Sequence, residues 1–343
     1  MNFSEDILQW HQSVDRKLPW KESNDPYKIW ISEIVLQQTR VEQGTQYYHR
    51  LITQFPTVQD LAAAPEDELM RQWKGLGYYS RARNMHKTAK IIVDQYSGIF
   101  PKTYKEILSL PGIGPYTAAA ISSFAYDLAH AVVDGNVYRV LSRVYGIFTP
   151  INSTAGKKEF SKLADDLLSR EQPASYNQAI MDFGALCCKP KNPKCIDCPM
   201  ASYCIAHQND YIGLLPQKEK KLKRRSRYFI GLVQHSSVGL IVEKRTEKDI
   251  WQGLYAIPMI ELEGSTTKEE MHQIVTAKYS DNVIAHIDSR KQKLTHQDIH
   301  IDFYNIEQKE VNDSPIMVST ETYDDYAYPR VIDDFIKDYL RVD

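Results

Sequence analysis

Residues 110–121, Leu-Pro-Gly-Ile-Gly-Pro-Tyr-Thr-Ala-Ala-Ala-Ile, decide the fold of the N-terminal half of this chain. Helical apolar spacing on either side predicts two helices, and the Pro-Gly-Ile-Gly-Pro segment predicts a tight connection between them. Gly112 and Gly114 let a partner approach the backbone closely and leave amides free at the start of the second helix, where phosphate binds well. Taken alone, the glycine pair leaves open an ordinary corner between two helices.

The rest of residues 1–215 predicts a mostly helical domain. Helical apolar spacing recurs in residues 27–39, 103–110, 116–126, 137–145, 158–168 and 176–186. Residues 228–343 differ in character, because apolar and β-branched residues there come in short runs. Residues 228–234, 239–243, 300–304 and 315–319 predict strands, and residues 268–279 and 331–339 predict helices. We therefore expect a C-terminal α+β domain.

The net charge of −2 on this 343-residue chain is distributed unevenly. Residues 1–215 carry +1, residues 216–227 (PQKEKKLKRRSR) carry +6, and residues 228–343 carry −9. The short basic block begins with Pro216 and predicts an interdomain linker. It is either a solvated tether or a segment that also contacts phosphate, and the sequence does not decide between the two.

The composition does not suggest a membrane protein. No apolar run approaches the roughly 20 residues that a membrane span needs. The acidic, amphipathic start, MNFSEDILQW, does not have the pattern of a secretory signal. We therefore expect a cytoplasmic protein.

Four of the five cysteines lie close together, in the pattern Cys188-x6-Cys195-x2-Cys198-x5-Cys204. A cytosolic chain does not normally use such a group for disulfides. Four thiolates bind zinc or a [4Fe–4S] cluster, and common zinc sites pair two Cys-x2-Cys knuckles where this chain has one. The fifth cysteine, Cys187, ends a predicted helix and is expected to be a thiol of the core.

Glu33 is the first of two carboxylates with catalytic potential. It lies in the middle of the predicted helix 27–39, and its neighbours one turn away are Ile29, Trp30, Leu36 and Gln37. A glutamate on such an apolar stripe would be desolvated, which raises its pKa and suits a general acid. A partly exposed helical glutamate is the commoner situation.

Asp134 is the second carboxylate. The Asp134-Gly-Asn136 turn places it just before a predicted helix, where the helix dipole and free amides favour the ionised form. A simple capping role explains the same pattern. Two carboxylates in contrasting environments are the groups needed to break a glycosidic bond, because one protonates the leaving group and the other faces the sugar cation.

Six segments together resemble the MutY adenine DNA glycosylases, across nearly the whole chain. They are residues 16–20 (RKLPW), 32–39 (SEIVLQQT), 75–84 (GLGYYSRARN), 110–121, 132–141 (VVDGNVYRVL) and 188–204. The resemblance implies a multidomain protein: an all-α helix–hairpin–helix glycosylase domain over residues 1–215, the linker over 216–227, and an α+β Nudix-like domain over 228–343 that recognises the lesion. It also implies that Cys188, Cys195, Cys198 and Cys204 hold one [4Fe–4S] cluster.

The same resemblance implies an activity and its residues. The family removes adenine mispaired with 8-oxoguanine or guanine from double-stranded DNA, in base excision repair, and we expect a monomer. Glu33 would protonate the adenine, Asp134 would stabilise or capture the anomeric carbon, and Tyr116 would hydrogen-bond within the active site. The adenine pocket would be lined by Arg16, Trp20 and Gln178.

Further residues would contact the duplex. Gln37 and Tyr78 would fill the gap or wedge the base stack, and an aromatic residue at a glycine turn can insert between base steps. Gln38, Gly112 and Gly114 would complete this surface. The segment Leu294-Thr295-His296 resembles the Phe-Ser-His loop with which the family recognises 8-oxoguanine, and Leu294 in place of Phe reduces the stacking area.

Three other functions fit the sequence less well. A glycosylase/lyase of the endonuclease III type carries a catalytic lysine where this chain has Tyr116, and without an amine no Schiff base can form. A DNA-binding protein without catalysis would not need Glu33 and Asp134. A Nudix hydrolase needs a glutamate-rich metal-binding helix, and residues 259–280 contain scattered glutamates without that array. We expect the C-terminal domain to bind without hydrolysing.

Overall fold

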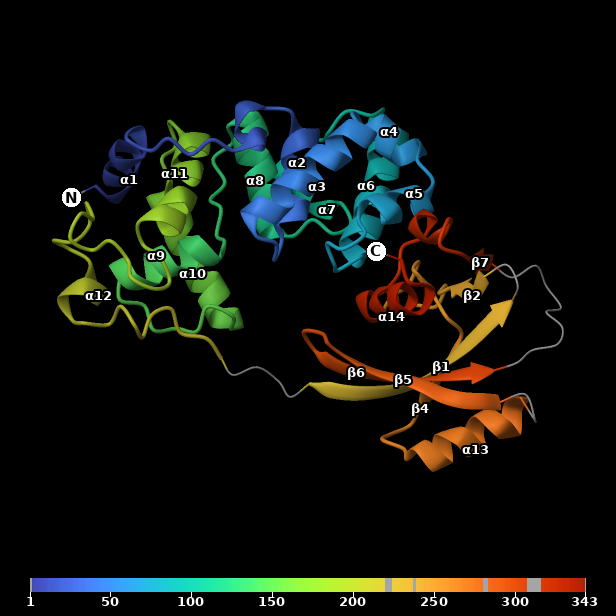
Figure 1. The fold of residues 1–343 in the computed structure, drawn as a ribbon. Helices are drawn as coiled ribbons and strands as arrows, with labels where there is room; N and C mark the ends of the chain where they lie inside the picture. The colour runs from blue at the N-terminus through green and yellow to red at the C-terminus, as the bar shows by residue number, and fades with distance from the viewer. Residues whose placement is uncertain (1, 220–223, 237–238, 280–282, 307–315, 343) are drawn as a thin grey trace. The chain divides into compact units, whose positions relative to one another are not determined.

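The computed structural model describes residues 2–219, 224–236, 239–279, 283–306 and 316–342 (Figure 1). It divides into two compact units. The first unit comprises residues 1–63 and 83–220, and the second comprises residues 64–82 and 221–343. The second unit therefore includes a short segment from the middle of the N-terminal half. None of the helices among the described residues is long and apolar enough to cross a membrane.

The first unit is built from helices. In chain order they are α1 (Phe3–Gln12), η1 (Pro19–Glu22), α2 (Pro26–Leu36), α3 (Val41–Gln54), α4 (Val58–Ala63), α6 (Ser80–Tyr96), α7 (Tyr104–Ser109), α8 (Pro115–Tyr126), α9 (Gly135–Val144), α10 (Thr154–Leu167), α11 (Pro173–Leu186) and α12 (Ile205–Gln208). Figure 1 shows α11 between α1 and α9, and the three helices share one apolar core. All six helices predicted for this half are present.

The hairpin between α7 and α8 depends on a glycine. Gly112 has a φ of +77°, a conformation that side chains other than hydrogen rarely adopt. A Cβ at this position would also lie 2.7 Å from the Cβ of Asn84 in α6. α7 begins with a capping box between Thr103 and Glu106, and α8 begins with Pro115 at its first position. The hairpin is thus fixed by local sequence at both ends.

The predicted C-terminal end of α2 is wrong. The apolar pattern predicted a helix to Thr39, but α2 ends at Leu36. Gln37 leaves the helical conformation with a ψ of 112°, and Gln38 has a φ of +58°, in the left-handed region. The pattern missed this end because Gln37 and Gln38 are ordinary helix formers and no glycine or proline marks the turn.

The second unit is a mixed sheet with a helix on each face. Its helical elements are α5 (Glu66–Gln72), α13 (Lys268–Tyr279), η3 (Tyr323–Asp325) and α14 (Arg330–Leu340). Its strands are β1 (Arg225–Ser236), β2 (Gly239–Lys244), β3 (Tyr255–Ala256), β4 (Met259–Leu262), β5 (Val283–Lys293), β6 (Gln297–Ile306) and β7 (Ile316–Val318). The strand order is β3-β2-β1-β6-β5, with β4 on β1 and β7 on β2, and β1 and β6 run parallel.

Alternation along β6 builds the two cores of this unit. Ile301 and Phe303 face α14, whose Phe335 ring stacks on Phe303 at 3.9 Å. Tyr304 and Ile306 belong to the opposite core, under α13. The α+β expectation is confirmed, and the predicted helices α13 and α14 are present.

Several boundaries in this part differ from the expected ones. β1 begins at Arg225, inside the segment expected to be a linker, and residues 220–223 of that segment lie outside the described residues. β7 covers residues 316–318, and Pro315, with which its predicted strand begins, also lies outside them. β5 was not predicted. It ends the strand order, and polar residues along it obscure the alternation that marks a strand.

Residues 64–82 pack with the C-terminal sheet. Asp67 of α5 accepts hydrogen bonds from Lys244 Nζ (2.6 Å) and the Tyr255 hydroxyl (3.0 Å). Lys74 Nζ lies 3.1 Å from a carboxylate oxygen of Asp324 and 3.8 Å from the centre of the Tyr323 ring. These contacts place the Gly75–Tyr79 turn in the second unit.

Candidate active site

A cavity of about 550 Å³ lies in the first unit, and this volume is within the usual range for a small-molecule site. Side chains from α1, η1, α2, α8 and α11 and from the start of α9 line it. The cavity contains all three predicted catalytic residues and all three predicted base-pocket residues: Arg16, Trp20, Glu33, Tyr116, Asp134 and Gln178. The structure therefore brings together residues that are up to 162 positions apart in the chain.

Glu33 lies in α2 and is 7% exposed. Burial raises the pKa of its carboxyl from the ordinary 4.5 to about 7, and the nearby Asp134 adds to the rise. A hydrogen bond from the Tyr116 hydroxyl opposes it. The desolvation expected from the apolar neighbours is thus present, and Glu33 can hold a proton near neutral pH.

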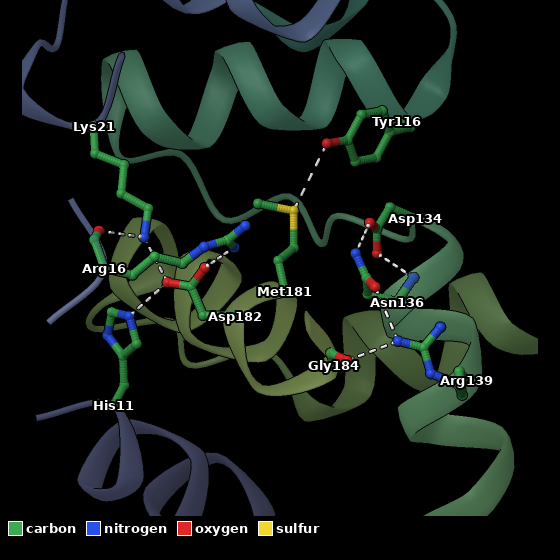
Figure 2. Close-up of polar contacts among 10 residues, drawn as sticks. All are labelled: His11, Arg16, Lys21, Tyr116, Asp134, Asn136, Arg139, Met181, Asp182 and Gly184. Carbon is green, nitrogen blue, oxygen red and sulfur yellow. Dashed lines mark hydrogen bonds and ion pairs between the residues drawn. The ribbon is translucent and has the colours of Figure 1, made fainter. Parts of the chain in front are cut away.

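Tyr116 occupies the first turn of α8, directly after the hairpin. Its hydroxyl also lies 3.7 Å from the sulfur of Met181 (Figure 2). Burial and the carboxyls of Glu33 and Asp134 raise its pKa well above the ordinary value. Tyr116 is therefore a neutral hydrogen-bonding group, and the hairpin fixes its position in the cavity.

Asp134 is the N-cap of α9. Its carboxylate accepts hydrogen bonds from the backbone amides of Asn136 and Val137, both at 2.8 Å, and from Asn136 Nδ2 at 2.7 Å. Arg139 supports this arrangement, because it donates to Asn136 Oδ1 (2.9 Å) and to the backbone carbonyl of Cys188 (2.8 Å). The start of α9 is thereby bonded to the first residue of the cysteine loop. Figure 2 shows Arg139 between Asn136 and the carbonyl of Gly184.

The start of α9 favours the ionised form of Asp134, as expected, but burial acts against it and has the larger effect. Burial raises the pKa of this carboxyl above its ordinary value. The hydrogen bonds from Val137 and Asn136 and the charge of Arg139 lower it, and they offset only part of the burial effect. The sequence showed the capping position but not the depth of the cavity around it.

Trp20, Arg16 and Gln178 form another part of the cavity wall. Trp20 lies in η1, and its ring packs edge-on against Tyr48 of α3 at 5.5 Å. Arg16 precedes η1, and Gln178 lies on α11. The wall thus combines an apolar ring with polar groups that can hydrogen-bond a planar base.

A charged cluster in this wall was missed by the sequence reasoning. Asp182 of α11 is 0% exposed and accepts from Arg16 Nη1 (2.6 Å), Lys21 Nζ (2.5 Å) and His11 Nε2 (2.9 Å) (Figure 2). These bonds lower the pKa of its carboxyl to about 2, against the effect of burial. A signal was present, because Asp182 lies four residues after Gln178 and so on the same face of α11.

The four predicted ligand cysteines line one small apolar cavity. Val144, Phe183 and Ile212 contribute to its wall, together with Cys187 at the end of α11. Arg143 lies within 3.5 Å of the sulfur of Cys188 and donates to the backbone carbonyl of Lys189 at 2.7 Å. The four thiols surround a shared apolar space, and the buried Arg143 holds the backbone beside Cys188. This arrangement suits a cluster whose four irons are each bound by one thiolate.

We expect the purified protein to be brown and to hold about four irons per chain. Cys198→Ser should lower the iron content and weaken DNA binding, because a hydroxyl is a poor ligand for iron. Cys187→Ser is the matched control, and it should keep both. Iron and zinc are measured by elemental analysis of anaerobically purified protein, and stoichiometric zinc without iron would contradict the assignment.

The predicted DNA-facing residues of the first unit lie near the hairpin. Gln37 Nε2 donates to the hydroxyl of Thr117 in α8 at 3.4 Å, and Gln38 is exposed. Gly112 and Gly114 are exposed, and a Cβ on Gly114 would meet nothing within 4 Å. The backbone at this turn is therefore accessible to a partner.

The remaining predicted residues lie in the second unit. Leu294, Thr295 and His296 form the turn between β5 and β6, which is closed by the bond from the Leu294 amide to the Gln297 carbonyl (2.7 Å). Leu294 packs against the core of the sheet, whereas Thr295 and His296 are exposed. Tyr78 is 49% exposed, and its hydroxyl is hydrogen-bonded to the hydroxyl of Thr295. The predicted wedge and the predicted recognition loop thus touch.

Comparison with known families supports the two-part architecture. Residues 31–166 match the HhH-GPD superfamily of base excision DNA repair proteins. Residues 188–204 match the iron–sulfur binding domain of endonuclease III, and residues 229–338 match the NUDIX domain. The cysteine loop is therefore an iron–sulfur loop, and its cluster in this family is [4Fe–4S].

Individual relatives identify the family. The adenine DNA glycosylase of Buchnera aphidicola subsp. Baizongia pistaciae is 40% identical over 259 residues, which are 75% of this chain and 73% of the relative. The enzyme of the same name from subsp. Acyrthosiphon pisum is 34% identical over 87% of this chain and 85% of its own. A solved thermostable thymine-DNA glycosylase matches 60% of this chain and 95% of its own, with a TM-score of 0.56 and 31% identity.

These matches cover the hairpin, the iron–sulfur loop and the Nudix-like sheet in one chain, in the order that the sequence predicts. The two adenine DNA glycosylases are matched over 73% and 85% of their own length. The chain belongs to the MutY family of adenine DNA glycosylases, base excision repair enzymes that hydrolyse the N-glycosidic bond of adenine in DNA.

Proposed function

We propose that this enzyme excises adenine mispaired with 8-oxoguanine or guanine, as a monomeric, monofunctional glycosylase that flips the adenine out of the duplex. One observation carries the proposal: a single cavity holds Glu33, whose pKa burial raises to about 7, and a hydrogen-bonded Asp134. These are the acid and the carboxylate that glycosidic cleavage needs. Because the proposed substrate is double-stranded DNA, we place the enzyme in the bacterial cytoplasm or nucleoid.

The reaction begins when the flipped adenine enters the cavity between Arg16, Trp20 and Gln178. Glu33 donates its proton to the leaving base as the N-glycosidic bond breaks, so the departing adenine is neutral. Asp134 faces the positive charge that develops on the sugar and either stabilises it or captures the anomeric carbon before water completes hydrolysis. Tyr116 holds the Glu33 carboxyl in place and, lacking an amine, gives no Schiff base.

The hairpin and the cysteine loop bind the phosphate backbone of the duplex. The exposed backbone at Gly112 and Gly114 suits a phosphate, and such contacts position the enzyme without reading bases. Lys191 and Lys194 are exposed on the cysteine loop and add positive charge. When bound, the iron–sulfur cluster supplies a rigid core for this loop and performs no step of the hydrolysis.

The lesion has to be read on the other strand, because the excised adenine is undamaged. We assign this role to the second unit. Residues 228–343 carry −9, so this part of the unit cannot act by bulk attraction to DNA and has to act through a few placed contacts. Thr295 can donate or accept a hydrogen bond, and His296 offers a second donor. Tyr78, bonded to Thr295, would wedge the stack beside the base being read.

The experiment combines Thr295→Ala with His296→Ala. Single-turnover excision is measured on adenine opposite 8-oxoguanine and opposite guanine. We expect the double variant to lose roughly tenfold of its preference for 8-oxoguanine, as one or two good hydrogen bonds to a base would give. The product strand should break only after alkali, because the enzyme leaves an abasic site.

The matched control is Thr320→Ala with His272→Ala, an exposed threonine and histidine elsewhere in the same unit. It should leave the ratio of the two rates unchanged. An unchanged ratio in the loop variant as well would show that this loop does not read the lesion. Strand cleavage without alkali would overturn the monofunctional assignment.

A further inference from the structure

The Asp182 cluster is not needed to explain either proton transfer or sugar stabilisation, yet it forms part of the cavity wall. Asp182 itself lies behind the wall, with no exposed surface. Its three partners His11, Arg16 and Lys21 all line the cavity, and the side chains of Arg16 and Lys21 are 25% and 17% exposed. One buried carboxylate therefore holds a row of two cations, Arg16 and Lys21, and one imidazole in the wall of the cavity in which the base would be protonated.

Such a row is unfavourable for the proposed reaction. Adenine gains a proton and the sugar becomes cationic as the bond breaks, so extra positive charge in the wall opposes both events. With Arg16 and Lys21 charged and Asp182 ionised, the wall carries a single positive charge, which Asp134 balances. Without Asp182 the cavity would carry an excess positive charge, and Arg16 and Lys21 would repel each other.

We propose that Asp182 is a positioning residue of the active site, which holds Arg16 and Lys21 as hydrogen-bond donors for the base while cancelling enough of their charge for the base to accept a proton and the sugar to become cationic. This inference rests on the proposed role of Glu33 as the acid. It predicts that the charge of the wall, and not only its shape, sets the pH range in which the enzyme works.

The groups that share the cavity with Glu33 decide how this can be measured. They are Tyr116 from α8, Asp134 from the start of α9, His11 from α1, and Arg16 and Lys21 around η1. α3 also packs against α2, and it lines the cavity with the apolar Val41. Burial raises the pKa of Glu33 to about 7, so its proton is lost near neutral pH. If the inference holds, the charge of the wall shifts this loss.

The test is the pH dependence of single-turnover excision in the full-length enzyme. The wild type should lose activity as the pH rises through about 7, the pKa of Glu33. Asp182→Asn makes the wall more positive and should move this loss to lower pH by roughly one unit. Lys21→Met makes the wall less positive and should move it to higher pH.

Two further variants separate charge from structure. The double variant Asp182→Asn with Lys21→Met restores the charge of the wall and should return the loss of activity to the wild-type pH. Asp182→Glu keeps the charge of the wall, so this variant should also lose activity at the wild-type pH. A purely structural role would lower the amount of active enzyme and leave the pH of the transition unmoved in all four. If Asp182→Asn does not fold, Lys21→Met tests the inference alone. A shift of the activity loss to higher pH supports the inference, and no shift or a shift to lower pH contradicts it.

Failure of this inference can be told from failure of the mechanism. Two results would show that Glu33 is not the titrating acid and would overturn the proposed mechanism. One is a wild-type pH profile without a loss of activity near neutral pH. The other is a loss of activity near neutral pH that disappears in His11→Asn. A normal wild-type profile that neither Asp182→Asn nor Lys21→Met moves would overturn the inference alone.

Discussion

Glu33→Gln should bind DNA with an adenine mispair and release almost no adenine. The amide has the shape of the carboxyl but no proton to donate, and a positioned general acid contributes roughly 10²–10⁴-fold to such reactions. Single-turnover excision measured beside a binding titration separates the two effects. Excision at a rate close to that of the wild type would exclude Glu33 as the acid.

The same variant should be more stable than the wild type above neutral pH. The pKa of Glu33 rises from 4.5 in an ordinary environment to about 7 in the folded protein, so the folded state holds the proton more tightly. Stability therefore falls as the pH rises from about 4.5 to about 7, by an amount on the order of 3 kcal/mol. Glutamine cannot ionise and avoids this loss. The control Glu42→Gln, at an exposed position of α3, should change neither stability nor excision.

Asp134→Asn should lose roughly 10²–10³-fold in excision rate, because no negative charge would face the sugar cation. The fold should survive this change, since asparagine is as good an N-cap as aspartate and its oxygen can still accept from the amides of Asn136 and Val137. A thermal melt and a DNA-binding titration serve as the controls.

If Asp134→Asn cleaved at the wild-type rate, the sugar cation would have to be stabilised by another group, and Glu33 would be the remaining carboxylate in the cavity. If the variant instead failed to bind DNA, the loss of activity would come from disruption of the hydrogen bonds that link Asp134, Asn136 and Arg139. It would then not come from the loss of a charge facing the sugar cation. Asn136→Ala separates these two outcomes, because it removes the bridge and keeps the Asp134 charge.

The sequence predicted the parts of the site well where each part is local. Glu33 sits on an apolar helix face, Tyr116 follows a glycine hairpin, and Asp134 caps a helix, and each of these is visible within ten residues. Their meeting in one cavity follows from packing between helices distant in sequence, which only the resemblance to a known family anticipated. The role of each residue stays a prediction until the variants are measured.

The Asp182 cluster shows what local patterns cannot supply. Asp182 looks like an ordinary polar residue of α11, and its partners lie between 161 and 171 positions earlier in the chain. Desolvation around Asp134 was missed for the same reason, because the burial comes from other helices. In β5 the cause was different: an edge strand buries little, so its sequence carries weak alternation.

The packing of residues 64–82 with the C-terminal sheet means that no single scission separates the two units. The chain enters the second unit near residue 64, returns to the first at residue 83, and leaves again after residue 220. A stop codon shortly after Pro216 would remove Lys244, Tyr255 and Asp324, the groups that hold Asp67 and Lys74. A nonsense allele at that point would thus leave residues 64–82 without the sheet on which they pack, and would also delete the segment to which we assign recognition of the lesion.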